Sequence, residues 1–151
     1  MAPSAVEVLR RDHRCIDALL NDCLRVAADE HAQAPSADRN ALLERLAARL
    51  RVHADIEVNL FYPAIPVSAL TRATAQLDHA EIVRQLNGLL VPVMPGEDYE
   101  RRLIALAQLF RSHVGFEEEQ LFPQAASLDL EALGIRLAMR RGELLGEQGA
   151  D

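Results

Sequence analysis

The sequence has no tryptophan, and only 4% of its 151 residues are aromatic. No stretch approaches the roughly 18 uninterrupted apolar residues that a membrane-spanning helix needs. The N-terminal segment MAPSAVEVLRRD has no basic stretch followed by an apolar one, so it does not resemble a secretory signal peptide. We therefore expect a cytoplasmic protein with no membrane partner.

Basic residues are outnumbered by acidic ones, 16 against 23. The net charge is −7, and the pairs of adjacent arginines are scattered along the chain rather than pooled. Nucleic acid is therefore not an expected partner, because its phosphates are bound by concentrated basic patches. Cys15 and Cys23 lie about 12 Å apart along one predicted helix, so they cannot bridge each other there. We expect both thiols to be reduced, as is usual in the cytoplasm.

The sequence is rich in helical periodicity. Ala, Leu, Arg and Glu dominate, and apolar residues recur with a period near 3.6 in four segments, without a competing period-2 pattern. We predict helices over about residues 4–29, 38–62, 68–91 and 97–122, followed by a weaker helix over about 128–145. Ser4 and Glu7 have capping-box spacing, and Pro63, Pro66 and Pro123 are expected to end the second and fourth helices.

The two halves of the chain resemble each other. A D-H-x-x-I pattern begins at Asp12 and again at Asp78. A longer match joins the second and fourth helices: Leu43, Leu46, Leu50, Arg51, His53, Glu57, Tyr62 and Pro63 align with Leu103, Leu106, Phe110, Arg111, His113, Glu117, Phe122 and Pro123. This duplication predicts an all-α fold, an up-down-up-down four-helix bundle over about residues 4–123. We expect a single domain over residues 1–151, with a short extra C-terminal helix.

Polar residues interrupt the apolar seam of each predicted helix. They are His13, His53, Glu57, His79, His113 and Glu117. Counting residues to each turn, at a rise of about 1.5 Å per residue, places the four histidines near one level of the bundle. The His-x-x-x-Glu spacing in the second and fourth helices puts each carboxylate one turn away on the same face.

Burying four imidazoles and two carboxylates together without a partner is very costly. Two di- or trivalent cations would remove that cost, because carboxylates can bridge them while histidines cap the outer positions. The symmetric assignment places His13 and His53 on one metal and His79 and His113 on the other, with both glutamates bridging. The alternative is a metal-free bundle, which must explain six buried polar residues. Glu-x-x-His pairs, a His-Glu-x-x-His motif and a four-thiolate site are absent from the sequence.

The array H…HxxxE…H…HxxxE, with the two HxxxE runs ending in FYP and LFP, resembles the hemerythrin-like HHE cation-binding family. The resemblance covers about residues 6–123. It implies a non-haem di-iron centre, two iron ions joined by an oxo or hydroxo bridge, which handles dioxygen, nitric oxide, peroxide or iron itself. Oxygen-carrying hemerythrins have a further histidine four residues after the third one, where this chain has Val83. They also have Asp in place of the second glutamate. At both positions, this chain therefore resembles the HHE branch instead.

The resemblance leaves several functions open. The first is a protein that binds or senses dioxygen, nitric oxide or a related small ligand. The alternatives are an enzyme acting on peroxide or nitric oxide, which Val83 would favour by opening both irons, and an iron storage or delivery protein. The C-terminal helix carries an apolar stripe of Leu130, Leu133 and Leu137, which offers a surface for a homodimer or for a regulatory partner.

Other residues near the six have more ordinary interpretations. Tyr62 is rotated by about 140° from Glu57 on an ideal helix, so we expect it to pack near the bundle end, with a ligand or redox role as the alternative. Asp17 is either a partner of the site or a surface residue. Glu118 and Glu119 are expected on a solvated face, and His31 on a polar loop.

Overall fold

The computed structural model describes residues 2–30, 37–91 and 94–148, and over these residues every regular element is a helix. The predicted all-α class is confirmed. The long helices are α1 (Ala5–Glu30), α2 (Ala37–Ile56), α4 (Ala69–Leu89), α5 (Gly96–Phe116) and α6 (Leu130–Gln148). Within the described ranges, no helix is both long and apolar enough to cross a membrane.

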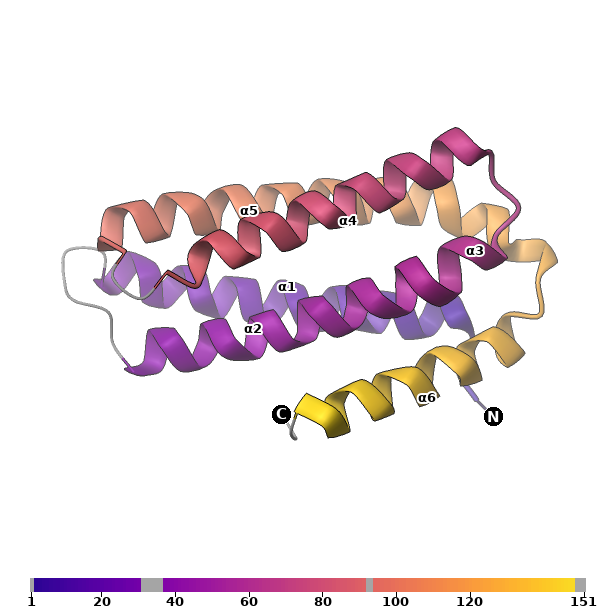
Figure 1. Cartoon of the computed structure of the whole chain (residues 1–151), viewed down its shortest axis with the longest axis horizontal. Coiled ribbons are helices and arrows are strands. Elements are labelled where there is room, and N and C mark those ends of the chain that lie inside the picture. Colours follow the sequence, from indigo (N-terminus) through magenta and orange to yellow (C-terminus); the bar gives the residue numbers. More distant parts are fainter. Residues whose placement is uncertain (1, 31–36, 92–93, 149–151) are drawn as a thin grey trace.

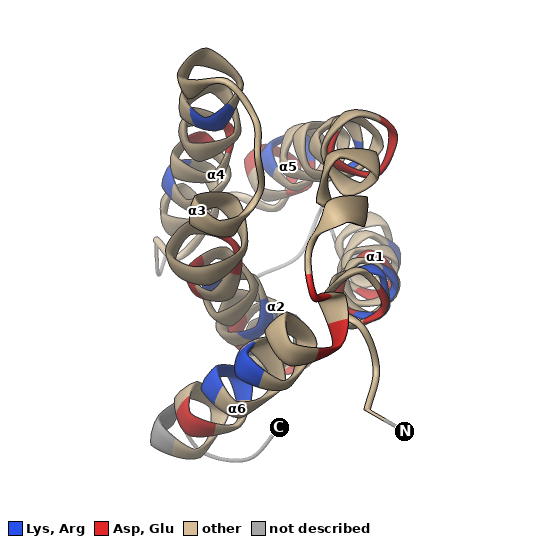
Figure 2. Cartoon of the chain, turned by 90° about the vertical axis from the view of Figure 1, so that its right-hand side faces the viewer, with Lys and Arg blue, Asp and Glu red and all other residues tan. Residues whose placement is uncertain are grey.

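Four of the long helices lie side by side along the longest axis of the molecule. Figure 1 shows α1, α2, α4 and α5 in this arrangement, with successive helices running in opposite directions. Helix α1 packs against α2 and α5, and α4 packs against the same two helices. Helix α6 lies outside this group, and the end-on view in Figure 2 shows it against α2 and α1.

The helix starts agree with their sequence signals. The Glu7 amide donates to Ser4 Oγ over 3.2 Å, and the Ser4 amide donates to Glu7 Oε2 over 3.0 Å, which confirms the predicted capping box. The expected stop at Pro63 is wrong, because helix α3 (Tyr62–Ala64) continues past it. Proline is tolerated there because it occupies the first turn of a new helical segment, where its missing N–H is not needed. After α5, the 3₁₀-helix η3 (Phe122–Ser127) likewise continues past Pro123.

The hydrophobic core is divided into two clusters, and the six polar residues lie between them. One cluster gathers side chains from Ile16 to Ala27, from the first part of α2 and α5, and from the second part of α4. The other gathers the start of α1, Ala75 and the ends of the second and fourth helical stretches together with α6. In all four helices the chain therefore passes from one apolar cluster through a polar layer into the other.

Helix α6 lies along the outside of α1 and α2, in the half of the bundle near the N-terminus (Figure 1). Its Leu133 and Leu137 are 5% and 0% exposed and belong to the second core cluster. The stripe that we expected to support a dimer is therefore used within the chain. On the outer face of α6, Ile135 and Met139 are exposed, and a homodimer through this helix, which stays a prediction, would have to use them.

Candidate metal centre

All six residues singled out in the sequence converge in the polar layer. None is more than 4% exposed: His13, His53, Glu57, His79, His113 and Glu117. Their ligand atoms form two groups, each within a span of 4.8 Å, one with His13 and His53 and the other with His79 and His113. Glu57 and Glu117 belong to both groups. The structure thus brings the six residues together in the pairing expected from the sequence, and their role as metal ligands stays a prediction.

Each glutamate offers a separate oxygen to each pair of histidines. Glu57 Oε1 lies 2.9 Å from His53 Nε2, and Glu57 Oε2 lies 2.5 Å from His79 Nε2. Glu117 Oε1 lies 3.0 Å from His13 Nε2, and Glu117 Oε2 lies 3.2 Å from His113 Nε2. Carboxylates arranged in this way can each bridge two cations.

The donor atoms fit metal ligation better than mutual hydrogen bonding. His53 Nε2 and Glu117 Oε1 are both buried, and neither has a hydrogen-bond partner among the described residues although each has an oppositely charged neighbour within 3.0 Å. A buried polar atom without a partner costs about 1–3 kcal/mol. Imidazole nitrogens and carboxylate oxygens form a mixed donor set that suits first-row transition metals such as iron.

Each glutamate also begins a short π-helix, η1 (Glu57–Phe61) or η2 (Glu117–Leu121). The Tyr62 amide donates to the Glu57 carbonyl, and the Phe122 amide donates to the Glu117 carbonyl, five residues back instead of four. A π-turn brings residue i+5 almost over residue i, whereas an α-helix rotates it away. Short π-helical insertions are frequent at functional sites, and here they lie at equivalent places in both halves.

The π-turn at Glu57 places the Tyr62 hydroxyl in the middle of the cluster. This oxygen lies 2.7 Å from Glu57 Oε2, 2.6 Å from Glu117 Oε2 and 3.0 Å from His113 Nε2. The expectation that Tyr62 packs near the bundle end is therefore wrong, because it assumed ideal α-helical rotation. Burial and the two carboxylates raise the pKa of Tyr62, which keeps the phenol neutral and able to donate. Its counterpart Phe122 has no hydroxyl and stacks on the His13 ring instead.

Three of the four histidines have a carboxylate on the ring nitrogen that faces away from the cluster. His53 Nδ1 lies 3.3 Å from Asp12 Oδ2, and His113 Nδ1 lies 3.2 Å from Asp78 Oδ2. Carboxylates in this position orient the imidazole and increase its basicity toward a metal. The duplicated D-H-x-x-I pattern contains both aspartates, but the pattern by itself does not predict this role.

The third carboxylate is Glu118, whose Oε2 lies 2.9 Å from His13 Nδ1. The expectation that Glu118 belongs to a solvated face is wrong, since its side chain reaches back from η2 to His13 on α1. By contrast, His79 Nδ1 is buried without a hydrogen-bond partner among the described residues. His31 lies outside the described residues.

The carboxylates strongly favour protonated histidines when no metal is bound. Burial alone would lower the pKa of His13, but its close contacts with the Glu117 and Glu57 carboxylates outweigh burial and raise the pKa to about 11. The same competition raises the pKa of His113 to about 10, and Glu57 with Asp12 raises that of His53 to about 9. Against the effect of burial, the neighbouring histidines hold the pKa of Glu57 well below its usual value. A cation entering the cluster would therefore take the place of protons.

Comparison with known proteins agrees with this geometry. A sequence model of the hemerythrin HHE cation-binding domain matches residues 4–125. The chain belongs to this family. Uncharacterized proteins of Mycobacterium bovis and of Mycobacterium tuberculosis, the latter called Rv2633c, are each 26% identical over 150 residues, which is 95% of this chain and 88% of theirs.

A solved relative has the same fold. The crystal structure of a hemerythrin HHE cation-binding domain-containing protein from Mycobacterium kansasii, described as an Rv2633c homolog, superposes with a TM-score of 0.80 at 28% sequence identity. The match covers 96% of this chain and 89% of that one. The resemblance noted in the sequence is therefore confirmed, and the buried His and Glu cluster gives this hemerythrin-family chain residues suited to bind cations.

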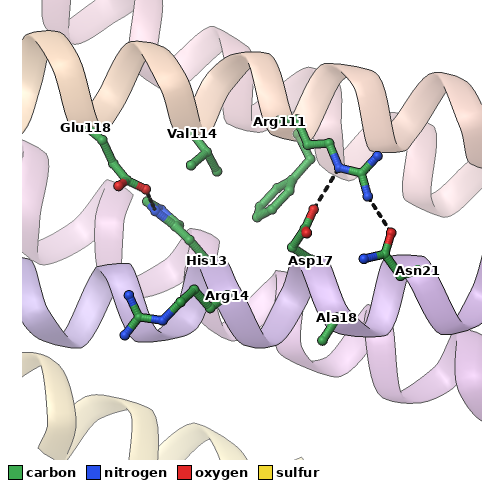
Figure 3. Close-up of a pocket in the computed structure, with 9 residues that line it drawn as sticks. His13, Arg14, Asp17, Ala18, Asn21, Arg111, Val114 and Glu118 are labelled. Atoms are coloured by element: carbon green, nitrogen blue, oxygen red, sulfur yellow. Dashed lines mark hydrogen bonds and ion pairs between the residues drawn. The ribbon is translucent and has the colours of Figure 1, made fainter.

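Two clefts lead from the surface of this hemerythrin-family domain to the cluster. The first, of about 340 Å³, lies between α1 and α5 and is lined in part by Phe110. It reaches His13 and Glu118 (Figure 3). Asp17 lines it and forms an ion pair with Arg111 over 2.7 Å, so its partner is not a member of the cluster. The second cleft, of about 550 Å³, lies between α2 and α4 and reaches His79 beside Val83. The position that lacks the further histidine of the oxygen carriers is thus beside an opening to solvent.

Proposed function

We propose that the chain holds two iron ions within an up-down-up-down four-helix bundle and uses them to bind or sense a small ligand such as dioxygen or nitric oxide. The observation that carries the proposal is the sharing of Glu57 and Glu117 between two four-residue groups. Two bound iron ions would supply redox-active positions at which a small oxygen- or nitrogen-containing molecule can bind.

The protein would provide each ion with two imidazole nitrogens and two carboxylate oxygens. Transition metals of this kind commonly accept five or six ligands, so such a donor set leaves room for a solvent-derived bridge and an exchangeable ligand. Asp12, Asp78 and Glu118 hold three of the imidazole rings in the orientation that turns Nε2 inward. These contacts would favour a preformed site over one assembled on binding.

The remaining residues would control access and protons. The apolar clusters on both sides of the polar layer keep bulk water away from it. Small molecules could enter by the clefts at His13 and at Val83. The neutral Tyr62 hydroxyl stands among the carboxylates and could donate a hydrogen bond to a small ligand in the cluster.

A second candidate is an enzyme that acts on peroxide or nitric oxide. It is favoured by the two clefts, because the one beside Val83 would leave a position on the second ion open to a substrate. In the other cleft, the partly exposed Glu118 could exchange protons with solvent close to the cluster during turnover.

The two candidates predict different reactions of the iron-loaded protein with small molecules. Anaerobically reduced protein should bind nitric oxide in a fixed ratio to its iron, with a change in the visible spectrum that reverses when nitric oxide is removed. Rapid oxygen evolution from hydrogen peroxide, in proportion to bound iron, would instead favour the enzyme. His113→Ala should abolish either response, and His31→Ala, which changes the one histidine outside the six, should retain it. If iron-loaded protein shows neither response, both candidates are wrong.

A further inference from the structure

Asp12 and Asp78 have equivalent places in the two halves of the chain but different surroundings. Each accepts a hydrogen bond from the outward nitrogen of the histidine on the following helix, His53 or His113. The Asp12 side chain is 13% exposed, and the Asp78 side chain is 36% exposed. Arg141 donates from Nη2 to Asp12 Oδ1 over 2.5 Å, whereas no arginine in the described ranges forms an ion pair with Asp78.

Helix α6 is the source of this difference, because it has no counterpart in the duplicated hairpins. Leu133 and Leu137 anchor it in the core, and Gly134 lies against the backbone of Pro3 and Ser4. Arg141 follows Leu137 by one turn, so it lies on the same side of the helix. It also reaches the Val8 carbonyl at 3.5 Å, which ties the guanidinium to α1 near Asp12.

We propose that Arg141 is a positioning residue for His53 that acts through Asp12. Through this contact, α6 makes the metal position of His13 and His53 different from that of His79 and His113. The inference rests on the proposed two-metal centre. It adds a role for the C-terminal helix, which contributes no ligand to that centre.

The physical basis is the restraint of a carboxylate by a charged donor. A guanidinium–carboxylate hydrogen bond is about twice as strong as a neutral one, so it limits the rotation of the Asp12 side chain. A fixed carboxylate holds the imidazole ring of His53 in one orientation and one tautomer. Asp78 is more exposed and lacks this restraint, so His113 keeps its orientation less firmly.

The test is anaerobic titration of the whole chain with ferrous iron against a competing chelator, which yields two dissociation constants. Arg141→Gln should raise one of them by about tenfold or more, the usual effect of losing such an outer contact, and leave the other unchanged. Arg140→Gln is the matched control, because Arg140 directly precedes Arg141 and, among the described residues, bonds only Asp55 and Glu143, outside the cluster. It should change neither constant.

A double-mutant cycle shows whether Arg141 acts through Asp12. Asp12→Asn should weaken the same constant as Arg141→Gln, Asp78→Asn should weaken the other, and the pair Arg141→Gln with Asp12→Asn should bind iron no worse than Asp12→Asn alone. Arg141→Lys keeps the charge, so its iron dissociation constants should lie between those of the wild type and of Arg141→Gln. It replaces Arg141→Gln in the test if the glutamine variant does not fold.

Three results would overturn the inference: equal changes in both constants, additive effects in the cycle, or an Arg141 variant that binds iron like Arg140→Gln. The proposed function fails in a different way, since the wild type itself would then bind fewer than two iron ions.

Discussion

The close approach of α6 at Gly134 to the N-terminal segment gives a prediction whose size can be worked out. A Cβ atom added to Gly134 would lie 2.3 Å from the Pro3 carbonyl oxygen and 2.8 Å from backbone atoms of Ser4 and Ala5. Backbone cannot rotate away as a side-chain end can, so Gly134→Ala must shift α6 or the N-terminal segment. Overpacking of this kind costs about 1–3 kcal/mol.

Gly142 is the matched control, because a Cβ there meets nothing within 4 Å. Both substitutions replace glycine inside the same helix and gain up to about 1 kcal/mol of helix propensity. The propensity gain cancels when the variants are compared, so Gly134→Ala should be less stable than Gly142→Ala by about 1–3 kcal/mol in urea unfolding. If Gly134→Ala is as stable as Gly142→Ala, α6 does not pack against the N-terminal segment in the way described.

Four further predictions concern the polar layer and the thiols. Tyr62→Phe should lower the unfolding free energy of chelator-treated protein by about 1.5–3 kcal/mol, the usual value of a hydrogen bond to a charged group, and an unchanged urea midpoint would contradict this. Three of the histidines have a raised pKa, about 11, 9 and 10 for His13, His53 and His113. Their contribution to the stability of the metal-free protein is complete below pH 6.5 and is lost as the pH rises through about 9 to 11, so this form should unfold more easily at pH 10 than at pH 7. Iron loading at pH 7 should also release protons, which calorimetry in two buffers of different ionisation enthalpy would detect. If the histidines were already neutral, this measurement would show no proton release. A thiol reagent should label one cysteine per folded chain, because Cys15 is exposed, whereas burial raises the pKa of Cys23 to about 11; two labelled thiols would show that Cys23 is accessible.

The helices and the six clustered residues could be predicted because both depend on local periodicity. Apolar residues at a spacing of 3.6 identify the buried face of each helix, and a histidine or glutamate within that face must be buried as well. Because the HxxxE spacing occurs twice, the six residues could be predicted to form one site. The predicted helix boundaries agree with the structure to within a few residues except after the two π-helices, where α3 and η3 carry the chain past Pro63 and Pro123.

The place of Tyr62 could not be predicted from ideal helix geometry. The rotation of Tyr62 relative to Glu57 depends on one backbone hydrogen bond that joins residues five apart instead of four. The sequence contains no strong signal for such a π-turn. The equivalent run in the second half has phenylalanine, so the duplication gave no hint of a hydroxyl group at this position.

The role of the outer carboxylates depends on contacts between helices. Residue spacing within one helix does not predict such contacts. Asp12 contacts His53, and Asp78 contacts His113. In the sequence, however, each aspartate directly precedes another histidine, His13 or His79. Their repeated occurrence before a predicted ligand was the signal that could have identified them. The contact of Arg141 with Asp12 depends in addition on how α6 docks, for which the two repeated hairpins offer no precedent.

The central claim is that the six buried residues hold two metal ions. The most direct test is the iron content of protein loaded anaerobically with excess ferrous iron and then freed of unbound metal. We predict two iron ions per chain for the wild type and for His31→Ala, and fewer than two for His53→Ala and for His113→Ala. A wild-type content well below two, or a content unchanged by loss of either histidine, would contradict the account.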